Sequence, residues 1–208
     1  MPIRGVIFDF GGVINNMRWD VARELEEKHG LERSTIVRTL YDNDEWRLAQ
    51  IGKADPADYR EAGHRRLEEA AGTSLPPLHQ QWRDSWALID ENLDLIRNLR
   101  SGYRLAILSN ADKNLVGRLR DGLGIFDLFD TVVCSADVGV AKPDPRIYEL
   151  TAERLELPPA DCVFIDDAEG NVTAAREVGM AAVHYRVHQG DSLPALLADL
   201  GVRPGPGA

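Results

Sequence analysis

The chain of 208 residues has 24 lysines and arginines against 34 aspartates and glutamates, so its formal net charge is −10. A protein this acidic is not expected to bind nucleic acid or an anionic membrane through its overall field, although a local basic site for a small anion stays open. Hydrophobic residues make up 44% of the chain and charged residues 28%, which indicates a soluble globular protein with one sizeable domain, or a domain with an insert.

The cysteines and the N-terminus favour a cytoplasmic protein. Cys134 and Cys162 each lie in an apolar run, and we expect buried thiols rather than a disulfide or a redox pair. The opening stretch MPIRGVIF lacks the apolar region of a signal peptide, and no apolar run approaches the ~18 residues of a membrane span. We therefore expect neither nucleic acid nor a membrane among its partners, and a monomer or a homodimer.

Five short apolar runs recur along the chain, each followed by a loop and then by a helical pattern. Runs of this length, rich in valine and isoleucine, are typical of buried parallel strands. They cover residues 5–10, 104–108, 131–134, 162–165 and 181–184. The alternation predicts an α/β fold, a Rossmann-like doubly wound parallel sheet whose ligand site lies at the carboxyl ends of the strands.

The stretch between the first two runs interrupts this alternation. It contains no convincing strand, and its helical patterns cover residues 19–29, 34–40, 56–71 and 77–88. Tyr59, Ala62 and Leu67 recur at helical spacing and are expected to share one apolar face. We therefore predict an α-helical bundle inserted over residues 16–88, within a core built from residues 1–15 and 89–208.

Polar side chains gather where the predicted strands stop. In a parallel sheet these ends emerge at the same edge, so the side chains that follow them are expected to converge. The set comprises one hydroxyl, one amide, one ammonium group and three carboxylates, from Ser109, Asn110, Lys142, Asp9, Asp166 and Asp167.

Such a set of groups indicates phosphoryl transfer. Converging carboxylates repel one another unless a proton or a cation neutralises them, and oxygen ligands suit a hard cation such as Mg²⁺. Lys142, Ser109 and Asn110 can hold phosphate oxygens, as can the backbone N–H groups of residues 10–12. Because a carboxylate facing phosphorus is a potential nucleophile, the pattern favours Mg²⁺-assisted transfer through an aspartyl intermediate.

Four ordered motifs resemble those of the haloacid dehalogenase (HAD) superfamily of hydrolases. They are Asp9-Phe10-Gly11-Gly12-Val13, Ser109-Asn110, Lys142-Pro143-Asp144-Pro145, and Asp166-Asp167 followed by Asn171. The resemblance covers nearly the whole chain, and the helical insert lies where one subfamily carries a helical-bundle cap. Within the superfamily, the chain resembles the sugar-phosphate phosphatases and the N-terminal phosphatase domain of epoxide hydrolases.

The resemblance implies a role for each matching residue. Asp9 corresponds to the nucleophile, which is also a Mg²⁺ ligand, and Lys142 to the cation that steadies nucleophile and phosphate. For the phosphate, the resemblance implies a binding hydroxyl at Ser109 with Asn110 beside it, and binding by the backbone of Gly11 and Gly12. For the metal, it implies a ligand at Asp167 with Asp166 in or next to the same shell, and the backbone carbonyl of Gly11. Asn171 corresponds to an amide that orients the loop.

The chain departs from the family pattern at Gly11, where the phosphatases usually carry a second aspartate as general acid and base. A glycine keeps the backbone carbonyl, so metal binding and the nucleophile are expected to survive while the proton transfer is lost. General acid–base catalysis is worth ~10²–10⁴-fold, so activity can persist. Either the leaving group is a good one, or a residue of the insert replaces the acid, with Asp44, Glu45 and Lys53 as candidates.

Three functions stay open from the sequence, with a Mg²⁺-dependent phosphatase acting on a small phosphorylated metabolite as the favoured one. A hydrolytic 2-haloacid dehalogenase needs no general acid, but that branch of the family is metal-free, and Asp166 with Asp167 would repel a haloacid. A third alternative is a catalytically weak or non-enzymatic member that binds a phospho-ligand. Trp19 and Trp46 are the tryptophans expected nearest to a substrate.

Overall fold

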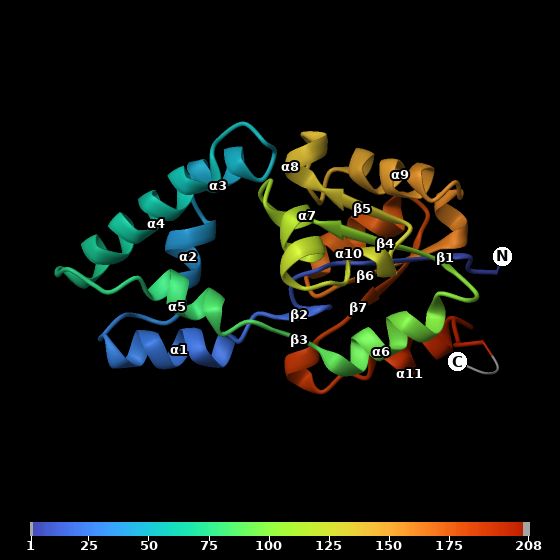
Figure 1. The fold of residues 1–208 in the computed structure, drawn as a ribbon, viewed down its shortest axis with the longest axis horizontal. Helices are drawn as coiled ribbons and strands as arrows, with labels where there is room; N and C mark the ends of the chain where they lie inside the picture. The colour runs from blue at the N-terminus through green and yellow to red at the C-terminus, as the bar shows by residue number, and fades with distance from the viewer. Residues whose placement is uncertain (1, 206–208) are drawn as a thin grey trace.

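The structure, a computed structural model, describes residues 2–205 and contains a five-stranded parallel sheet in the order β5-β4-β1-β6-β7 (Figure 1). The strands are β1 (Gly5–Phe8), β4 (Arg104–Ser109), β5 (Thr131–Cys134), β6 (Cys162–Asp166) and β7 (Ala181–His184). The predicted α/β class and all five strands are confirmed. The first strand ends two residues earlier than expected, whereas β4 and β6 each run one residue further, to Ser109 and Asp166.

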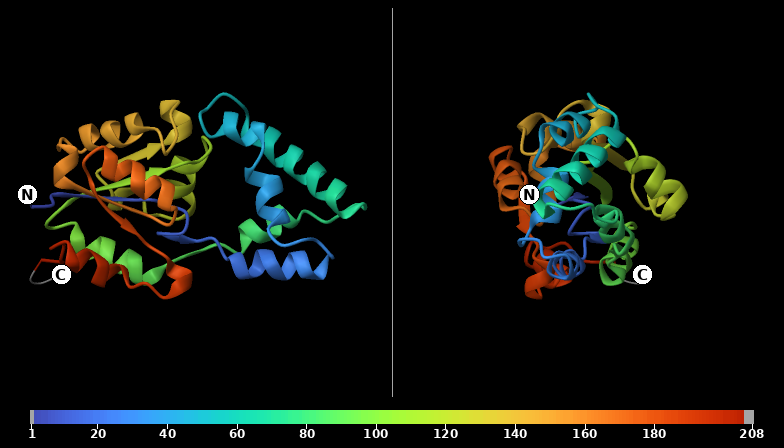
Figure 2. Two further views of the ribbon diagram at one scale, coloured as in Figure 1. Left: turned by 180° about the vertical axis from the view of Figure 1, so that it is seen from behind. Right: turned by 90° about the vertical axis from the view of Figure 1, so that its left-hand side faces the viewer.

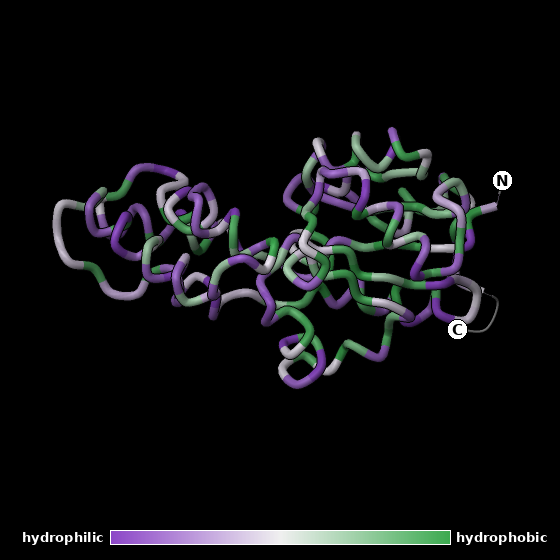
Figure 3. The backbone as a smooth tube through the Cα atoms, turned by 90° about the horizontal axis from the view of Figure 1, so that it is seen from above, coloured by the Kyte–Doolittle hydropathy of each residue, from purple (hydrophilic) through white to green (hydrophobic). Residues whose placement is uncertain are grey.

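The central strand β1 is buried on both faces. Val6 and Phe8 belong to the apolar cluster on one face of the sheet, and Ile7 belongs to the cluster on the other. All three side chains are fully buried because successive residues of a strand point to opposite faces and helices cover both. Figure 3 shows the same pattern, with the hydrophobic stretches concentrated along the strands inside the larger lobe.

Helices on the two faces of the sheet complete the core. Clusters of buried leucines from α6 (Asp90–Leu99) and α11 (Leu193–Asp199) cover one face, while α9 (Pro145–Arg154) and α10 (Glu169–Glu177) cover the other. The remaining helical segments of this lobe are α7 (Leu115–Gly117), α8 (Ser135–Val138), and short 3-10 helices at Phe126–Leu128, Pro159–Asp161 and Val187–Gln189. Helix α7 continues directly into one turn of π-helix, Arg118–Gly122.

Five helices form a second lobe beside the carboxyl ends of the strands (Figures 1 and 2). This helical lobe contains α1 (Trp19–Lys28), α2 (Thr35–Tyr41), α3 (Asp44–Ala49), α4 (Pro56–Ala71) and α5 (Leu78–Asp84). It has an apolar cluster of its own, in which Tyr59, Ala62 and Leu67 are buried on one face of α4 as expected.

Two features of the inserted region differ from the prediction. Helix α3 was not expected because its six residues carry little apolar periodicity; its start is fixed by Asn43, whose side chain accepts a hydrogen bond from Trp46 N at 2.7 Å. The expectation of no strand was also wrong, since β2 (Asn15–Asn16) pairs antiparallel with β3 (Ala87–Leu88). Helix α5 accordingly ends at Asp84 rather than near residue 88. This two-stranded ribbon joins the two chain segments that connect the lobes.

Both cysteines are buried free thiols, in agreement with the sequence. No helix within residues 2–205 is long and apolar enough to cross a lipid bilayer.

Candidate active site

A cavity of about 250 Å³ lies where the carboxyl ends of β1, β4 and β6 meet the helical lobe. The sheet edge therefore brings together most of the residues that the sequence singled out. From the core, the lining includes Asp9, Gly11, Ser109, Asn110, Lys142, Asp167 and Asn171. Gly12 and Asp166 are not among the lining residues and lie just behind that surface.

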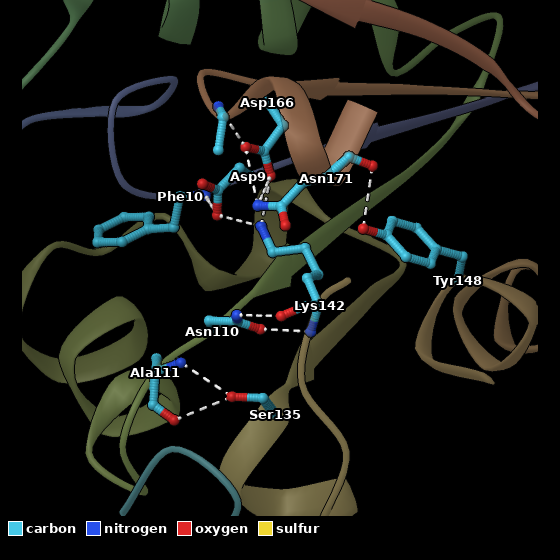
Figure 4. Close-up of polar contacts among 10 residues, drawn as sticks. Asp9, Phe10, Asn110, Ala111, Ser135, Lys142, Tyr148, Asp166 and Asn171 are labelled. Carbon is cyan, nitrogen blue, oxygen red and sulfur yellow. Dashed lines mark hydrogen bonds and ion pairs between the residues drawn. The ribbon is translucent and has the colours of Figure 1, made fainter. Parts of the chain in front are cut away.

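Lys142 links two of the carboxylates (Figure 4). Its Nζ lies 3.0 Å from Asp9 Oδ1 and 2.6 Å from Asp166 Oδ2, with the side chain only 1% exposed. Burial by itself would lower the pKa of Lys142, but the carboxylates of Asp9 and Asp166 outweigh it and raise that pKa. Lys142 is thus held as a cation between the end of β1 and the end of β6.

Asp166 is fully buried and acts as the anchor of this group. Besides the lysine, its carboxylate accepts hydrogen bonds from the Asn171 side chain, at 3.1 Å to each oxygen, and from Ala168 N at 2.8 Å. Tyr148 in turn donates from its hydroxyl to the backbone oxygen of Asn171 at 3.0 Å. Asp166 therefore orients Lys142 and the loop after β6, which is also the loop that Asn171 was expected to orient.

Asp9 has one carboxylate oxygen engaged. Its Oδ1 accepts from Phe10 N at 2.7 Å and contacts Lys142, whereas no hydrogen bond to Oδ2 is found within residues 2–205. Burial raises the pKa of Asp9 to about 7; Lys142 opposes this rise, and the carboxylates of Asp166 and Asp167 add to it. The carboxylate is thus held in place yet keeps one oxygen available to a ligand.

Asp167 completes a cluster of three carboxylates. One oxygen from each of Asp9, Asp166 and Asp167 lies within 4.8 Å of the others, a spacing that fits a shared cation. Burial raises the pKa of Asp167 to about 6, and the neighbouring Asp166 adds to the rise. In the absence of a cation, this cluster holds more negative charge than Lys142 alone can neutralise.

The two glycines after Phe10 meet different constraints. Gly12 has φ +78°, and a Cβ placed on it would collide with the Asp167 carboxylate, so only glycine fits there. Gly11 has ordinary backbone geometry, and its Cβ would lie 2.9 Å from Met17 Sδ. The place of the family's second aspartate is therefore occupied by a flexible methionine side chain, not closed off by the backbone.

Asn110 also positions the loop that carries Lys142. Its Nδ2 donates to the Lys142 backbone oxygen and its Oδ1 accepts from the Lys142 backbone nitrogen, both at 2.8 Å. These two bonds hold the Lys142 loop in place, and the second N–H of Nδ2 is left for a phosphate oxygen in the cavity that Asn110 lines. Ser109, the last residue of β4, lines the cavity beside it.

The candidates for a replacement acid do not line the cavity. Asp44 pairs with Arg47 at 2.8 Å, Glu45 pairs with Arg66 at 2.8 Å, and Lys53 is exposed. That expectation was wrong because Glu45 reaches across to α4, whereas Asp44 and Lys53 are exposed on the surface of the helical lobe. Trp19 and Trp46 do line the cavity as expected.

The sequence analysis missed several cavity residues. Asp112, three residues beyond the end of β4, accepts hydrogen bonds from the Tyr59 hydroxyl and from Arg60 Nη2, both at 2.8 Å. Burial would raise the pKa of Asp112, but hydrogen bonds from Asn114 N and Tyr59, with the charge of Arg60, outweigh it and lower that pKa. This contact ties the helical lobe to the core. The other missed lining residues are Asn15, Met17, Tyr41, Tyr59, Arg83, Trp86, Ala111 and Arg118.

Comparison with known proteins matches this arrangement to a family. A sequence profile described as haloacid dehalogenase-like hydrolase matches residues 3–179. Acyl-CoA dehydrogenase family member 10 of Mus musculus is 30% identical over 194 residues, covering 86% of this chain but only 18% of the mouse protein. D-ribitol-5-phosphate phosphatase of Bacteroides thetaiotaomicron is 26% identical over 187 residues, covering 85% of this chain and 89% of that protein.

Solved structures share the fold. A HAD family enzyme from Bacteroides thetaiotaomicron, in complex with magnesium and inorganic phosphate, superposes with a TM-score of 0.67 at 22% identity, covering 93% of this chain and 98% of that one. Both phosphatases and dehalogenases occur among the structures with this fold. The fold alone therefore does not choose between the two activities.

Proposed function

Because the chain belongs to the haloacid dehalogenase-like hydrolases, we propose that it is a Mg²⁺-dependent phosphatase. It acts on a small phosphorylated metabolite through an aspartyl-phosphate intermediate on Asp9. In this proposal residues 16–88 form a cap that closes the site and selects the substrate, and residues 1–15 and 89–208 carry the chemistry.

The charge of the site is the observation that carries the proposal. When ionised, the three carboxylates leave an excess of two negative charges over the one ammonium group of Lys142, and the raised pKa values of Asp9 and Asp167 reflect this crowding. An oxygen-only set of this charge fits a hard divalent cation, which Asp9, Asp167 and the Gly11 carbonyl would hold, with Asp166 next to them. When bound, Mg²⁺ supplies electrostatic stabilisation of the transferring phosphoryl group.

The chain's own residues then have distinct tasks. Asp9 Oδ2 attacks phosphorus while Lys142 and Phe10 N hold Oδ1; the bond from phosphorus to the leaving oxygen breaks, and the leaving group departs with its electron pair. Water then attacks the phosphorus of the aspartyl phosphate, which frees phosphate and restores Asp9. Ser109, the side-chain N–H of Asn110 and the backbone N–H of Gly11 bind the phosphoryl oxygens. Gly12 was also expected to bind phosphate through its backbone, but its N–H donates to Asn15 O at 2.8 Å and is engaged within the turn.

The missing acid at Gly11 sets the kind of substrate. None of Asp44, Glu45 and Lys53 lines the cavity, and Asp112 is engaged with Tyr59 and Arg60. A leaving group that departs without a proton, as from an acyl phosphate or an anomeric sugar phosphate, therefore suits this site best.

A phosphate-release assay tests the proposal. Acetyl phosphate, 4-nitrophenyl phosphate and a panel of sugar phosphates are incubated with the protein in Mg²⁺ and in EDTA, with Asp9→Asn as the matched inactive control. We expect release that requires both Mg²⁺ and Asp9. No release from any activated ester at high enzyme concentration would overturn the proposal, and halide release from a 2-haloacid in EDTA would assign the dehalogenase activity instead.

A further inference from the structure

Two arginines that line the cavity, one from the helical lobe and one from the core, have no carboxylate partner. Arg83, from α5, and Arg118, from the turn after α7, both line the cavity, and neither forms an ion pair within residues 2–205. Arg83 makes only a 3.4 Å contact with the Tyr59 hydroxyl. In a chain with ten more acidic than basic residues, the pairing of Arg60 with Asp112 shows the more usual arrangement. These two cations are therefore available to a ligand.

The groups around the arginines also lack a hydrogen-bond acceptor. Arg118 Nε and Trp86 Nε1 are buried, and neither has a hydrogen-bond partner in the part of the chain that the structure describes. The Arg118 guanidinium stacks over Phe10 at 5.0 Å and over Trp86 at 6.0 Å, and Arg83 lies 5.8 Å from the centre of Trp86. A buried donor without an acceptor is costly, so these donors point to an acceptor that a ligand supplies.

The position of the pair fits a second group on the substrate. Phe10 directly follows Asp9, so the Arg118 guanidinium stacks on the residue next to the nucleophile. A second pocket adjoins the cavity here, and it shares the lining residues Phe10, Arg83, Trp86 and Arg118. Besides the carboxylate cluster and the arginines, the cavity is lined by the aromatic side chains of Trp19, Trp46 and Tyr41.

We propose that Arg83 and Arg118 bind a second anionic group of the substrate, a carboxylate or a phosphate carried on the leaving group. This inference rests on the proposed phosphatase function and narrows it. The substrate is a phosphate ester or anhydride with two anionic ends joined by an apolar or planar body. Lys142 and the carboxylate cluster receive the transferring phosphoryl end, and the arginines receive the other.

Binding of non-hydrolysable compounds tests the proposal without relying on turnover. Titration calorimetry in Mg²⁺ compares 3-(phosphonomethyl)phenylacetate with its neutral amide and with 1,3-bis(phosphonomethyl)benzene, which separates carboxylate from phosphate recognition. We expect the anionic compounds to bind about 10- to 100-fold more tightly than the amide, as for one charge-assisted hydrogen bond or more. Arg118→Gln and Arg83→Gln should reduce that ratio toward one, while Arg97→Gln, an exposed arginine on α6, should leave it unchanged.

The outcomes separate this proposal from the one on which it rests. A wild-type ratio near one, a ratio that both cavity variants preserve, or no binding of any phosphonate would overturn the anion site. A clear preference for the anionic compounds, lost in Arg118→Gln, would establish the site even if the matching phosphate esters were not hydrolysed, in which case the phosphatase function alone would fail. Thermal melts confirm that the variants are folded.

Discussion

The carboxylate cluster predicts that the metal-free protein loses stability as the pH rises, and that Asp9→Asn removes much of this loss. The pKa of Asp9 is raised from 3.8 to about 7 in the folded protein, by burial and by Asp166 and Asp167 against the opposing Lys142. The folded state therefore holds a proton that the unfolded chain has already released. Between pH 4 and pH 7 the unfolded chain binds fewer protons, so the free energy of unfolding falls with pH.

The magnitude follows from the pKa values. A rise from 3.8 to about 7 corresponds to about 4 kcal/mol at 1.36 kcal/mol for each pKa unit, fully developed only above pH 7. Because asparagine is neutral at every pH, Asp9→Asn should gain stability over the wild type by about 1–2 kcal/mol at pH 5 and by about 4 kcal/mol at pH 8, both in EDTA.

Urea denaturation at a series of pH values measures this difference. Asp94→Asn is the matched control, since Asp94 is an exposed carboxylate paired with Arg97 on α6, and its effect should be small and nearly independent of pH. Adding Mg²⁺ at pH 8 should stabilise the wild type more than Asp9→Asn. Equal stabilities of the two proteins at pH 8 in EDTA would refute the account of a buried, electrostatically crowded Asp9.

Three further substitutions test other parts of the site. Lys142→Met should abolish phosphate release and destabilise the fold by about 3–5 kcal/mol, because Asp9 and Asp166 lose their buried counter-ion. Phosphate release and thermal melting are measured on the same preparation, and an active, stable variant would contradict this role of Lys142. Gly12→Ala should cost at least about 1–2 kcal/mol in a denaturant titration, because φ is +78° and Asp167 leaves no room, whereas Gly102→Ala, with open space around it, should cost less. Gly11→Asp is combined with Met17→Ala, because the Met17 sulfur occupies the space that the new side chain needs. This double variant should hydrolyse esters with poor leaving groups up to about 10²-fold faster, at unchanged Mg²⁺ affinity. No gain over Met17→Ala alone would mean that the native site already has an acid.

The strands of the core could be predicted from the sequence because the features that mark them are local. Each buried strand is a short run rich in valine and isoleucine, and its end is marked by a polar residue such as Asp9 or Ser109. Parallel topology then determines that these ends share one edge, which is why Lys142 meets Asp9 and Asp166 in the structure.

The contacts between the helical lobe and the core could not be predicted in the same way, because no sheet topology fixes where the side chains of these helices lie relative to the strand ends. Tyr59 meets Asp112 across 53 residues, and the lining arginines come from α5 and from the turn after α7. Helical periodicity predicts which face of a helix is buried but not which residues at its edge reach the core. For that reason Asp44, Glu45 and Lys53 were reasonable candidates by position, while Arg83 and Arg118 were not noticed.

The most direct test of the central claim is the detection of a phosphoryl group on Asp9. The protein is mixed with acetyl phosphate and Mg²⁺, quenched in acid during turnover, and digested for mass spectrometry. We predict one phosphoryl adduct on the peptide that contains Asp9, absent in EDTA and absent from Asp9→Asn. Phosphate release that continues without any adduct and persists in Asp9→Asn would contradict the account.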